Sequence, residues 1–436
     1  MSNTNETRIL QFTDASGNKL AYSGLSGLIL ESNEYIRESI SEPDKADPEI
    51  YSYLFDDPFL NVDFHFFHGE PDFDTLTVFT TNQCNLNCTY CFEKVSESNR
   101  ATQMDINVFK DGIIYFLSNF KHNKVINIHF FGGEPLLNFS LIKEAVYFLK
   151  SVERENELQF NYTVTTNGTL LNENEIRGFL VSNNFSVMVS IDGNEETHDK
   201  NRFFYNGQGS YKIIAENIKE LSKYINIMAR VTVTSPEIDL ISLYESLHDI
   251  GISEVTIELV SQNHDINLKT LSDSMKTFAD YFISNLRNKK LVRYKNFIDV
   301  LCSIHFGNRK SPKYFPCSAG VSAYALSPNG DIYPCHRFVN FEQYRWGSIY
   351  SNFDNEQRKD FLSKNILFIR NDGKCSECWA KYLCGGTCYN TSHFMNGNTE
   401  DVSPMHCLFL QEIIKNALYI YASLNDNERA IFDSMS

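Results

Sequence analysis

The run TNQCNLNCTYCFEK, residues 81–94, contains three closely spaced cysteines whose spacing is the strongest indication of fold and chemistry in the chain. Three residues separate Cys84 from Cys88, and two separate Cys88 from Cys91. An iron–sulfur cube has four irons, and a closed electron-transfer site holds it with four thiolates. Three thiols in one short loop therefore leave one iron open to a substrate. A zinc knuckle is the alternative, although it normally needs a fourth nearby Cys or His.

Six strand-like runs alternate with amphipathic helical stretches after residue 74. Each run is rich in β-branched or aromatic residues and is almost continuously apolar, as strands buried in a parallel sheet are. Six βα units in series predict either a parallel barrel or a doubly wound open sheet. The runs are TLTVFTT (75–81), VINIHFF (125–131), NYTVTT (161–166), FSVMVSI (185–191), NIMARVTVT (226–234) and EVTIELV (254–260).

Polar motifs follow the first four runs and favour the barrel. In a βα barrel the chemistry gathers where strands end and loops begin, so these motifs are expected to converge on one rim. The motifs are the cysteine loop, Gly-Gly-Glu-Pro (132–135), Thr-Asn-Gly (166–168) and Ser-Ile-Asp-Gly (190–193).

With Tyr90 before its last cysteine, the loop resembles that of the radical S-adenosylmethionine (SAM) enzymes, and the strand-end motifs extend the resemblance over about half the chain. The resemblance implies an α/β fold with a partial (β/α)6 TIM-like barrel over residues 74–300. It also implies a [4Fe-4S] cluster on Cys84, Cys88 and Cys91, whose open iron chelates the methionine end of SAM. A 5′-deoxyadenosyl radical would then take a hydrogen from an unactivated carbon.

The same resemblance implies which residues bind SAM. The two glycines of the second motif would let the backbone approach the ligand without a Cβ, and the glutamate would accept a hydrogen bond from the methionine ammonium. An asparagine and a serine would hold the ribose or methionine end, and an arginine would pair with the carboxylate. Two alternatives stay open: the arginine as a solvated loop charge, and Asp192 as a helix cap. The six residues are Gly132, Gly133, Glu134, Asn167, Ser190 and Arg202.

A second group of seven cysteines follows the barrel, within residues 301–410. Their spacing, with Gly330 between the first two, resembles the auxiliary-cluster domain called SPASM. Seven thiols exceed one tetrahedral site and suit two clusters, which would give three [4Fe-4S] clusters in all. A zinc site at the CxxC pair is the alternative. The resemblance implies an inner cluster on Cys317, Cys335 and Cys388, and an outer cluster on Cys375, Cys378, Cys384 and Cys407.

The fourth ligand of the inner cluster is open at this point. Cys302, fifteen positions before Cys317, either loops back to the cluster or leaves an iron free to bind a substrate thiolate. Free cysteines are also often small buried hydrophobes, which is the third possibility for Cys302.

His336 follows Cys335 in DIYPCHRFVN (331–340). Anaerobic sulfatase-maturing enzymes have an aspartate base there, so the histidine speaks against that reaction. The histidine is expected either to accept a proton or to support the cluster loop. With FFGGEPLLNF (130–139) and CWAKYLCGGTC (378–388), this run looks more like maturases of ribosomally made peptides, of the ranthipeptide or cyclophane type.

The function predicted from this resemblance is that of an oxidoreductase that forms a thioether between a cysteine sulfur and a carbon of a precursor peptide. A carbon-to-carbon cross-link is the first alternative, and a non-catalytic iron–sulfur scaffold is the second. The expected partners are a precursor peptide with its leader and a reductant such as ferredoxin or flavodoxin.

The composition of the chain argues against two further classes of partner, nucleic acids and membranes. The formal net charge of -16 makes nucleic acid an unsuitable partner. The first residues show no signal peptide and no apolar run is long enough to cross a bilayer, so we expect no membrane partner and a cytoplasmic location. Eleven cysteines in a reducing cytosol favour metal ligation over disulfides.

Two smaller segments flank the barrel and the cysteine region. Residues 1–73 predict a hairpin and then a helix, and their order suits a small α+β, winged-helix-like module that binds the leader along a strand edge. The alternative is an extension that only packs on the barrel. Residues 411–436 are expected to form an amphipathic closing helix.

Overall fold

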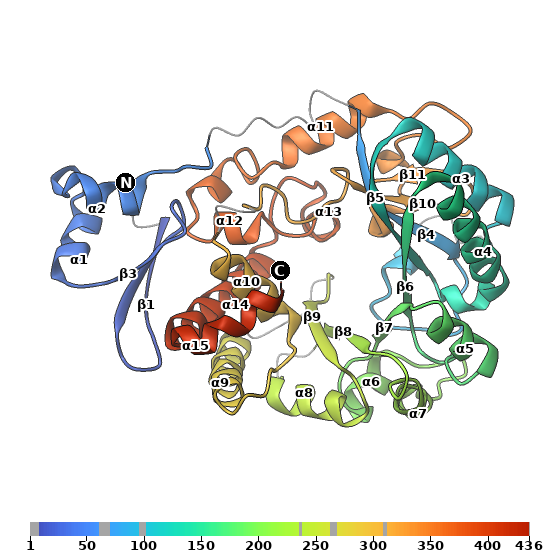
Figure 1. Cartoon of the computed structure of the whole chain (residues 1–436), viewed down its shortest axis with the longest axis horizontal. Coiled ribbons are helices and arrows are strands. Elements are labelled where there is room, and N and C mark those ends of the chain that lie inside the picture. The colour runs from blue at the N-terminus through green and yellow to red at the C-terminus, as the bar shows by residue number, and fades with distance from the viewer. Residues whose placement is uncertain are drawn as a thin grey trace.

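The fold is described from a computed structural model of the whole chain (Figure 1). The described residues are 8–60, 70–95, 102–234, 238–261, 268–307 and 312–435.

The central sheet has eight strands in the order β11-β10-β4-β5-β6-β7-β8-β9. The strands from β4 to β9 are all parallel and follow one another in chain order, as a partial barrel requires. All six predicted runs form these strands, and the predicted barrel is confirmed. The strands are β4 (Asp72–Thr81), β5 (Lys121–Gly132), β6 (Gln159–Thr166), β7 (Ser186–Ser190), β8 (Ile227–Val233) and β9 (Glu254–Leu259).

Helices cover the outer side of this curved sheet (Figure 1). Several begin at a side chain that accepts a hydrogen bond from the first turn, as Asp105, Asn194 and Asp239 do. Their apolar faces pack on the strands and form the large core. The helices are α3 (Ile106–Asn119), α4 (Phe139–Asn156), α5 (Asn174–Ser182), α6 (Glu195–Asn201), α7 (Tyr211–Leu221), α8 (Leu240–Asp249), α9 (Leu268–Arg287) and α10 (Lys295–His305).

The cysteine region extends the barrel sheet, which the sequence did not predict. β10 (Ala323–Leu326) pairs in parallel with β4, and β11 (Ile332–Tyr333) pairs antiparallel with β10. β11 has two residues, too few for a recognisable period. This pairing brings Cys335, just after β11, to the first strand of the barrel.

The rest of the cysteine region is mainly helical, and its helices α12 and α13 lie between the N-terminal module and the barrel strands (Figure 1). Helix α14 packs on α9 and α10, so the closing helix is present. The expected boundaries at 300/301 and 410/411 fall inside α10 and α14. No helix in the described part is both long and apolar enough to span a bilayer. The remaining helices are α11 (Asn355–Asn365), α12 (Lys381–Cys384), α13 (Tyr389–Asn396), α14 (Pro404–Ser423) and α15 (Asp426–Arg429).

The N-terminal module has its own three-stranded antiparallel sheet and two helices. The predicted hairpin is present, and its turn is closed by the Asp14 carboxylate, which accepts from the Ser16 and Asn18 amides. A small separate core joins sheet and helices. The elements are β1 (Ile9–Thr13), β2 (Lys19–Ser23), β3 (Ile29–Glu31), α1 (Glu34–Ser41) and α2 (Pro48–Phe55).

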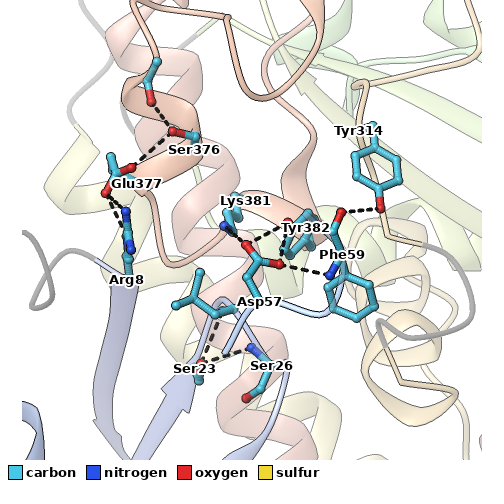
Figure 2. A network of polar contacts seen from close by, with 12 residues as sticks. Arg8, Ser23, Ser26, Asp57, Phe59, Tyr314, Ser376, Glu377, Lys381 and Tyr382 are labelled. Atoms are coloured by element: carbon cyan, nitrogen blue, oxygen red, sulfur yellow. Dashed lines mark hydrogen bonds and ion pairs between the residues drawn. The ribbon is translucent and has the colours of Figure 1, made fainter. Parts of the chain in front are cut away.

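The module is docked on the cysteine region by a polar network (Figure 2). The Lys381 ammonium lies 2.7 Å from the Asp57 carboxylate, with both side chains nearly buried, and the Tyr382 hydroxyl donates to the same carboxylate. Arg8 forms an ion pair with Glu377. Because Lys381 lies between Cys378 and Cys384, the module contacts the loop that carries those thiols.

Candidate active site

One cavity of about 380 Å³ opens at the rim where the barrel strands end. The three thiols of the first loop line it, together with residues from β5, β6 and β7 and from the cysteine region. The strand-end motifs therefore converge, and the second cysteine group contributes to the same cavity. The predicted site residues that line it are Cys84, Cys88, Cys91, Gly132, Gly133, Asn167, Ser190, Arg202 and His336.

The end of β5 holds the first cysteine loop in place. The Gly133 amide donates to the Thr81 carbonyl at 2.9 Å, and the Glu134 amide donates to the Gln83 carbonyl at 2.7 Å. A Cβ on Gly132 would lie 2.2 Å from the Thr81 oxygen, and one on Gly133 would lie 2.3 Å from the Gln83 oxygen. Both glycines are thus needed for contact with the loop backbone, in addition to the expected approach to SAM.

The three thiols of the loop affect one another electrostatically. Burial raises the pKa of the Cys84 thiol to about 12, and the nearby Glu134, Cys88 and Cys91 add to the rise. Thiolates held this close need a cationic group to stabilise them, which the irons of a cluster provide. Three thiols in one loop are the donor set expected for a cluster with one open iron.

Arg202 is buried and paired, so it is not a solvated loop charge. Its Nε donates to the Asp192 carboxylate at 2.9 Å, and its guanidinium lies 5.1 Å from the centre of the Tyr90 ring. The Tyr90 hydroxyl also donates to Asp192, whose other oxygen accepts from the Thr232 amide. Asp192 is not the cap of α6, because Asn194 has that role. This triad fixes the cysteine loop to the end of β7.

Glu134 is fully buried and accepts three hydrogen bonds from the chain. The donors are the Leu136 amide, the Thr166 hydroxyl and the Asn167 amide, at 3.1, 2.8 and 2.7 Å. Burial raises the pKa of its carboxyl to about 7. Glu134 thus ties the end of β5 to the end of β6, and its contact with SAM stays a prediction.

Asn167 lines the cavity beside the first cysteine loop. Its side-chain amide donates to Oδ1 of Asn85 at 2.7 Å and lies 3.8 Å from the Cys84 sulfur. Ser190, at the end of β7, also lines the cavity. The roles of both side chains toward SAM stay predictions.

Three polar residues within barrel strands line the cavity and were not among the predicted site residues: His129, Arg230 and Glu258. They lie within β5, β8 and β9, and the Arg230 guanidinium is 3.4 Å from the Glu258 carboxylate. The His129 ring nitrogen lies 2.8 Å from the Thr165 hydroxyl, and burial lowers the pKa of His129 to about 4. A charged or imidazole side chain inside an otherwise apolar strand was the available sign that these strands face a polar interior.

His336 lies in the cavity wall among aromatic rings. Its ring centre is 4.6 Å from that of Phe131, and His129 and Phe92 are further neighbours. Burial lowers its pKa well below the usual value, with His129, Arg337 and Arg230 adding to the effect. The imidazole is therefore neutral near pH 7.

The thiols of the second cysteine group have electrostatic neighbours in two sets, and their assignment to two clusters stays a prediction. Cys317 and Cys335 are affected by Cys388, and all three affect the same tyrosine, Tyr389. Cys378 and Cys384 affect both Cys375 and Cys407. Burial is the main reason that the pKa of the Cys317 thiol is raised to about 11 and that of Cys407 to about 12.

Cys302 is not placed with either set. It lines a separate cavity, and its electrostatic neighbours are Asp299 and Lys295 on its own helix, α10. Cys302 on α10 therefore does not lie beside Cys317 in this structure.

Arg337 joins the inner set to the first cysteine loop. Its Nη1 lies 3.4 Å from the Cys388 sulfur, and its guanidinium lies 5.5 Å from the centre of the Phe92 ring. Burial alone would raise the pKa of the Cys388 thiol, but Arg337 and Thr391 outweigh burial and lower it. The inner set thus lies directly behind the cavity wall.

A family model described as the radical SAM superfamily matches residues 78–250. The cysteine-type anaerobic sulfatase-maturating enzyme of Clostridium novyi is 29% identical over 344 residues, 74% of this chain and 90% of that enzyme. An uncharacterised protein of Methanocaldococcus jannaschii is 31% identical over 258 residues, 58% of this chain and 82% of that protein. The chain belongs to the radical SAM superfamily. It is therefore an enzyme, and the scaffold alternative is excluded.

Solved structures of radical SAM proteins share the fold. The structure of anSMEcpe with bound AdoMet matches with a TM-score of 0.69 and 20% identity, over 84% of this chain and 99% of that one. Streptococcus suis SuiB bound to precursor peptide SuiA matches with a TM-score of 0.55 and 14% identity, over 92% and 98%. As a radical SAM enzyme, the protein uses SAM and a [4Fe-4S] cluster, which Cys84, Cys88 and Cys91 would hold.

Proposed function

We propose that this radical SAM enzyme modifies a ribosomally synthesised precursor peptide by joining a cysteine sulfur to a carbon in a thioether. The grouping of the thiols carries the proposal. Cys317, Cys335 and Cys388 lie together beside the cavity, and of the eleven cysteines, all of them in the described part, no fourth joins them. Three thiols leave one iron of a cluster without a protein ligand, and a substrate thiol is a donor of the same class.

The residues of the cavity suit radical chemistry on a bound peptide. When bound, the cluster and SAM supply the 5′-deoxyadenosyl radical. The Tyr90, Asp192 and Arg202 triad fixes the loop that faces SAM, while Phe92 and Phe131 form an apolar wall. Such a wall excludes water and other groups that would quench a carbon radical.

The cavity also has polar lining residues, which suit recognition of a peptide. The Arg230 and Glu258 side chains are both more than a third exposed, and they pair with each other at 3.4 Å. Peptide groups can therefore bind there without a buried charge being left alone. The neutral His336 can accept the proton that the substrate thiol releases, or it can shape the pocket only.

The N-terminal module is the proposed site for the leader of the precursor. Strands β1 and β3 are the two edges of its sheet, and an edge strand can pair with an extended peptide. SuiB, which has the same fold, has been solved with its precursor peptide. Fluorescence anisotropy of a labelled leader, titrated with the full chain, tests this assignment, and absence of binding contradicts it. A ferredoxin or flavodoxin is the proposed reductant.

Two other outcomes of the same chemistry are testable. A carbon-to-carbon cross-link needs the same cavity and no substrate thiol. Oxidation of a cysteine to an aldehyde is the other outcome, because the Clostridium novyi relative is a cysteine-type sulfatase-maturating enzyme. His336, where that family has an aspartate base, is the reason that we rank this reaction second.

Anaerobic co-expression with the peptide of the neighbouring reading frame tests the proposal. We expect a product that has lost two hydrogens for each link and one alkylatable thiol for each link. A product that retains every thiol supports the carbon-to-carbon link and contradicts the thioether. A product that reacts with a hydrazide supports the aldehyde.

A further inference from the structure

Arg370 is a fully buried cation without an acidic partner in the described part of the chain. Its side chain has no solvent exposure, and no Asp or Glu forms an ion pair with it among the described residues. Its Nη2 donates to the Ser392 hydroxyl and the Thr399 carbonyl, both at 3.0 Å. These partners are neutral. A buried charge is costly unless an opposite charge lies near it.

One nitrogen of this guanidinium makes no hydrogen bond. Nη1 is buried and has no partner in the structure. It lies against Gly386, where a Cβ would be 2.7 Å away, so only glycine lets it come this close. Gly386 stands between Cys384 of the outer set and Cys388 of the inner set. The unpartnered nitrogen is thus next to the strip of backbone that separates the two sets.

The thiols of both sets are affected by Arg370. Its charge acts on Cys317 of the inner set and on Cys375 and Cys384 of the outer set, so it lies near thiols of both sets. Its guanidinium lies 4.9 Å from the centre of the Tyr389 ring, which also neighbours the inner thiols. An anionic group between these thiols would supply the missing opposite charge. Iron–sulfur clusters with thiolate ligands are such groups.

We propose that Arg370 is a shared counter-cation that stabilises the reduced form of both auxiliary clusters and raises their reduction potentials. The inference rests on the proposed assignment of the two clusters to these thiols. Reduction adds a negative charge to a cluster, and a nearby cation in a buried site favours that state. Arg370 is a positioning residue in this account, because it contacts neither SAM nor the substrate.

Arg358 provides a matched control. It is also an arginine with no exposure in the same region, and its Nε donates to the Gly320 carbonyl and the Tyr324 hydroxyl. Unlike Arg370, it is not among the charges that affect Cys317, Cys375 or Cys384. The variants Arg370→Gln and Arg358→Gln each remove one buried guanidinium charge. Both should lower the thermal unfolding midpoint, so stability alone does not separate them.

The deciding measurement is a redox titration of the holoenzyme monitored by electron paramagnetic resonance. With Arg370→Gln, we expect the ratio of reduced to oxidised cluster at a fixed potential to fall about tenfold for both auxiliary signals, which is about 59 mV for a one-electron couple. With Arg358→Gln, we expect both midpoints unchanged. Unchanged midpoints in an Arg370→Gln protein that keeps its iron would overturn the proposal.

The variant Arg370→Lys decides the outcome if Arg370→Gln does not assemble its clusters. Lysine keeps the charge and loses the planar fork. Assembly of both clusters in Arg370→Lys, with midpoints near those of the unsubstituted protein, supports a role for the charge. Failure of both variants to assemble clusters means that shape matters, and it contradicts the proposal. These readouts need no peptide, so they are independent of whether the thioether forms.

Discussion

The two cysteine groups differ in how the chain prepares them for a metal cluster. The first lies in one loop of eight residues that faces the cavity, and its neighbours include the Glu134 carboxyl, which adds to the rise in the pKa of Cys84. The second is assembled from segments far apart in sequence, and arginines stand beside its thiols. Arg202, near the first loop, is already paired with Asp192.

This difference corresponds to two kinds of site. Arg202, the cation beside the thiols of the first loop, is shared with Asp192, and SAM brings a sulfonium cation when it binds. In the second group, Arg337 and Arg370 supply positive charge permanently. The site that must exchange SAM thus differs from the second group, where fixed arginines lie beside the thiols of the proposed clusters. Substitutions in the two regions test this difference.

Cys84→Ala should have the largest effect, because it removes a ligand from the open site only. We expect release of 5′-deoxyadenosine to fall to background and about four irons to be lost from each chain. The second group should keep its iron. Iron analysis and chromatography of the reaction products measure both.

Cys302→Ala is the control for this substitution. Cys302 lies with neither set, so iron content and 5′-deoxyadenosine release should be unchanged. Loss of about four irons in this variant would show that Cys302 is a ligand after all.

Asp57→Ala tests whether the docked N-terminal module stabilises the segment between Cys378 and Cys384. The substitution leaves the buried Lys381 ammonium without its partner, and we expect a loss of about 3–5 kcal/mol in the docking of the N-terminal module. Hydrogen exchange in β1 and β2 should increase, and amides of α12 should follow. Asp56→Asn is the control, because Asp56 is exposed and should change nothing. Equal amide protection in the Asp57→Ala and Asp56→Asn variants would disprove this stabilising role of the module.

The sequence predicted which residues meet at the rim of the barrel, because the information for this is local. The spacing of three cysteines and the motifs at four strand ends required only that parallel strands end on one rim, and the cavity contains them together. The six strands of the barrel were predicted for the same reason, since each is a nearly continuous apolar run.

What the sequence did not reveal depends on contacts between distant segments. β11 has only two residues and pairs with β10, which in turn pairs with β4. Two residues are too few to show the alternating apolar pattern of a strand. The neighbours of the second group, Arg337 and Arg370, come from segments whose charges look like surface charges in the sequence. Arg230 and Glu258 could have been recognised, because a charge within a buried strand needs a polar interior.

Gly133→Ala tests how firmly β5 holds the first loop. The added Cβ would lie 2.3 Å from the Gln83 carbonyl oxygen, so the loop must move, and we expect a cost of about 1–3 kcal/mol. Release of 5′-deoxyadenosine should fall with it. Gly178→Ala is the control: this glycine lies in α5 with nothing within 4 Å of its Cβ position, so the substitution should be neutral or slightly stabilising. Equal unfolding midpoints for the two variants would contradict the role of the close contact between Gly133 and the loop.

The smallest effect concerns His198 on α6, which hydrogen-bonds to Asp192 of the triad that holds the first cysteine loop. It is fully buried, accepts a hydrogen bond from the Asp192 amide at 3.3 Å and lies 2.9 Å from the Ser210 hydroxyl. Burial lowers its pKa from 6.5 to about 4, so between these values the unfolded chain takes up a proton that the folded chain does not. Stability should therefore fall as the pH drops below 6.5, by ~1 kcal/mol for the first pH unit. Since His198→Asn keeps an acceptor but cannot titrate, its stability should be flatter over that range, measured by amide hydrogen exchange at the end of β7. An identical pH slope in the two proteins would mean that His198 already takes up its proton in the folded state, and that the support of Asp192 comes from elsewhere.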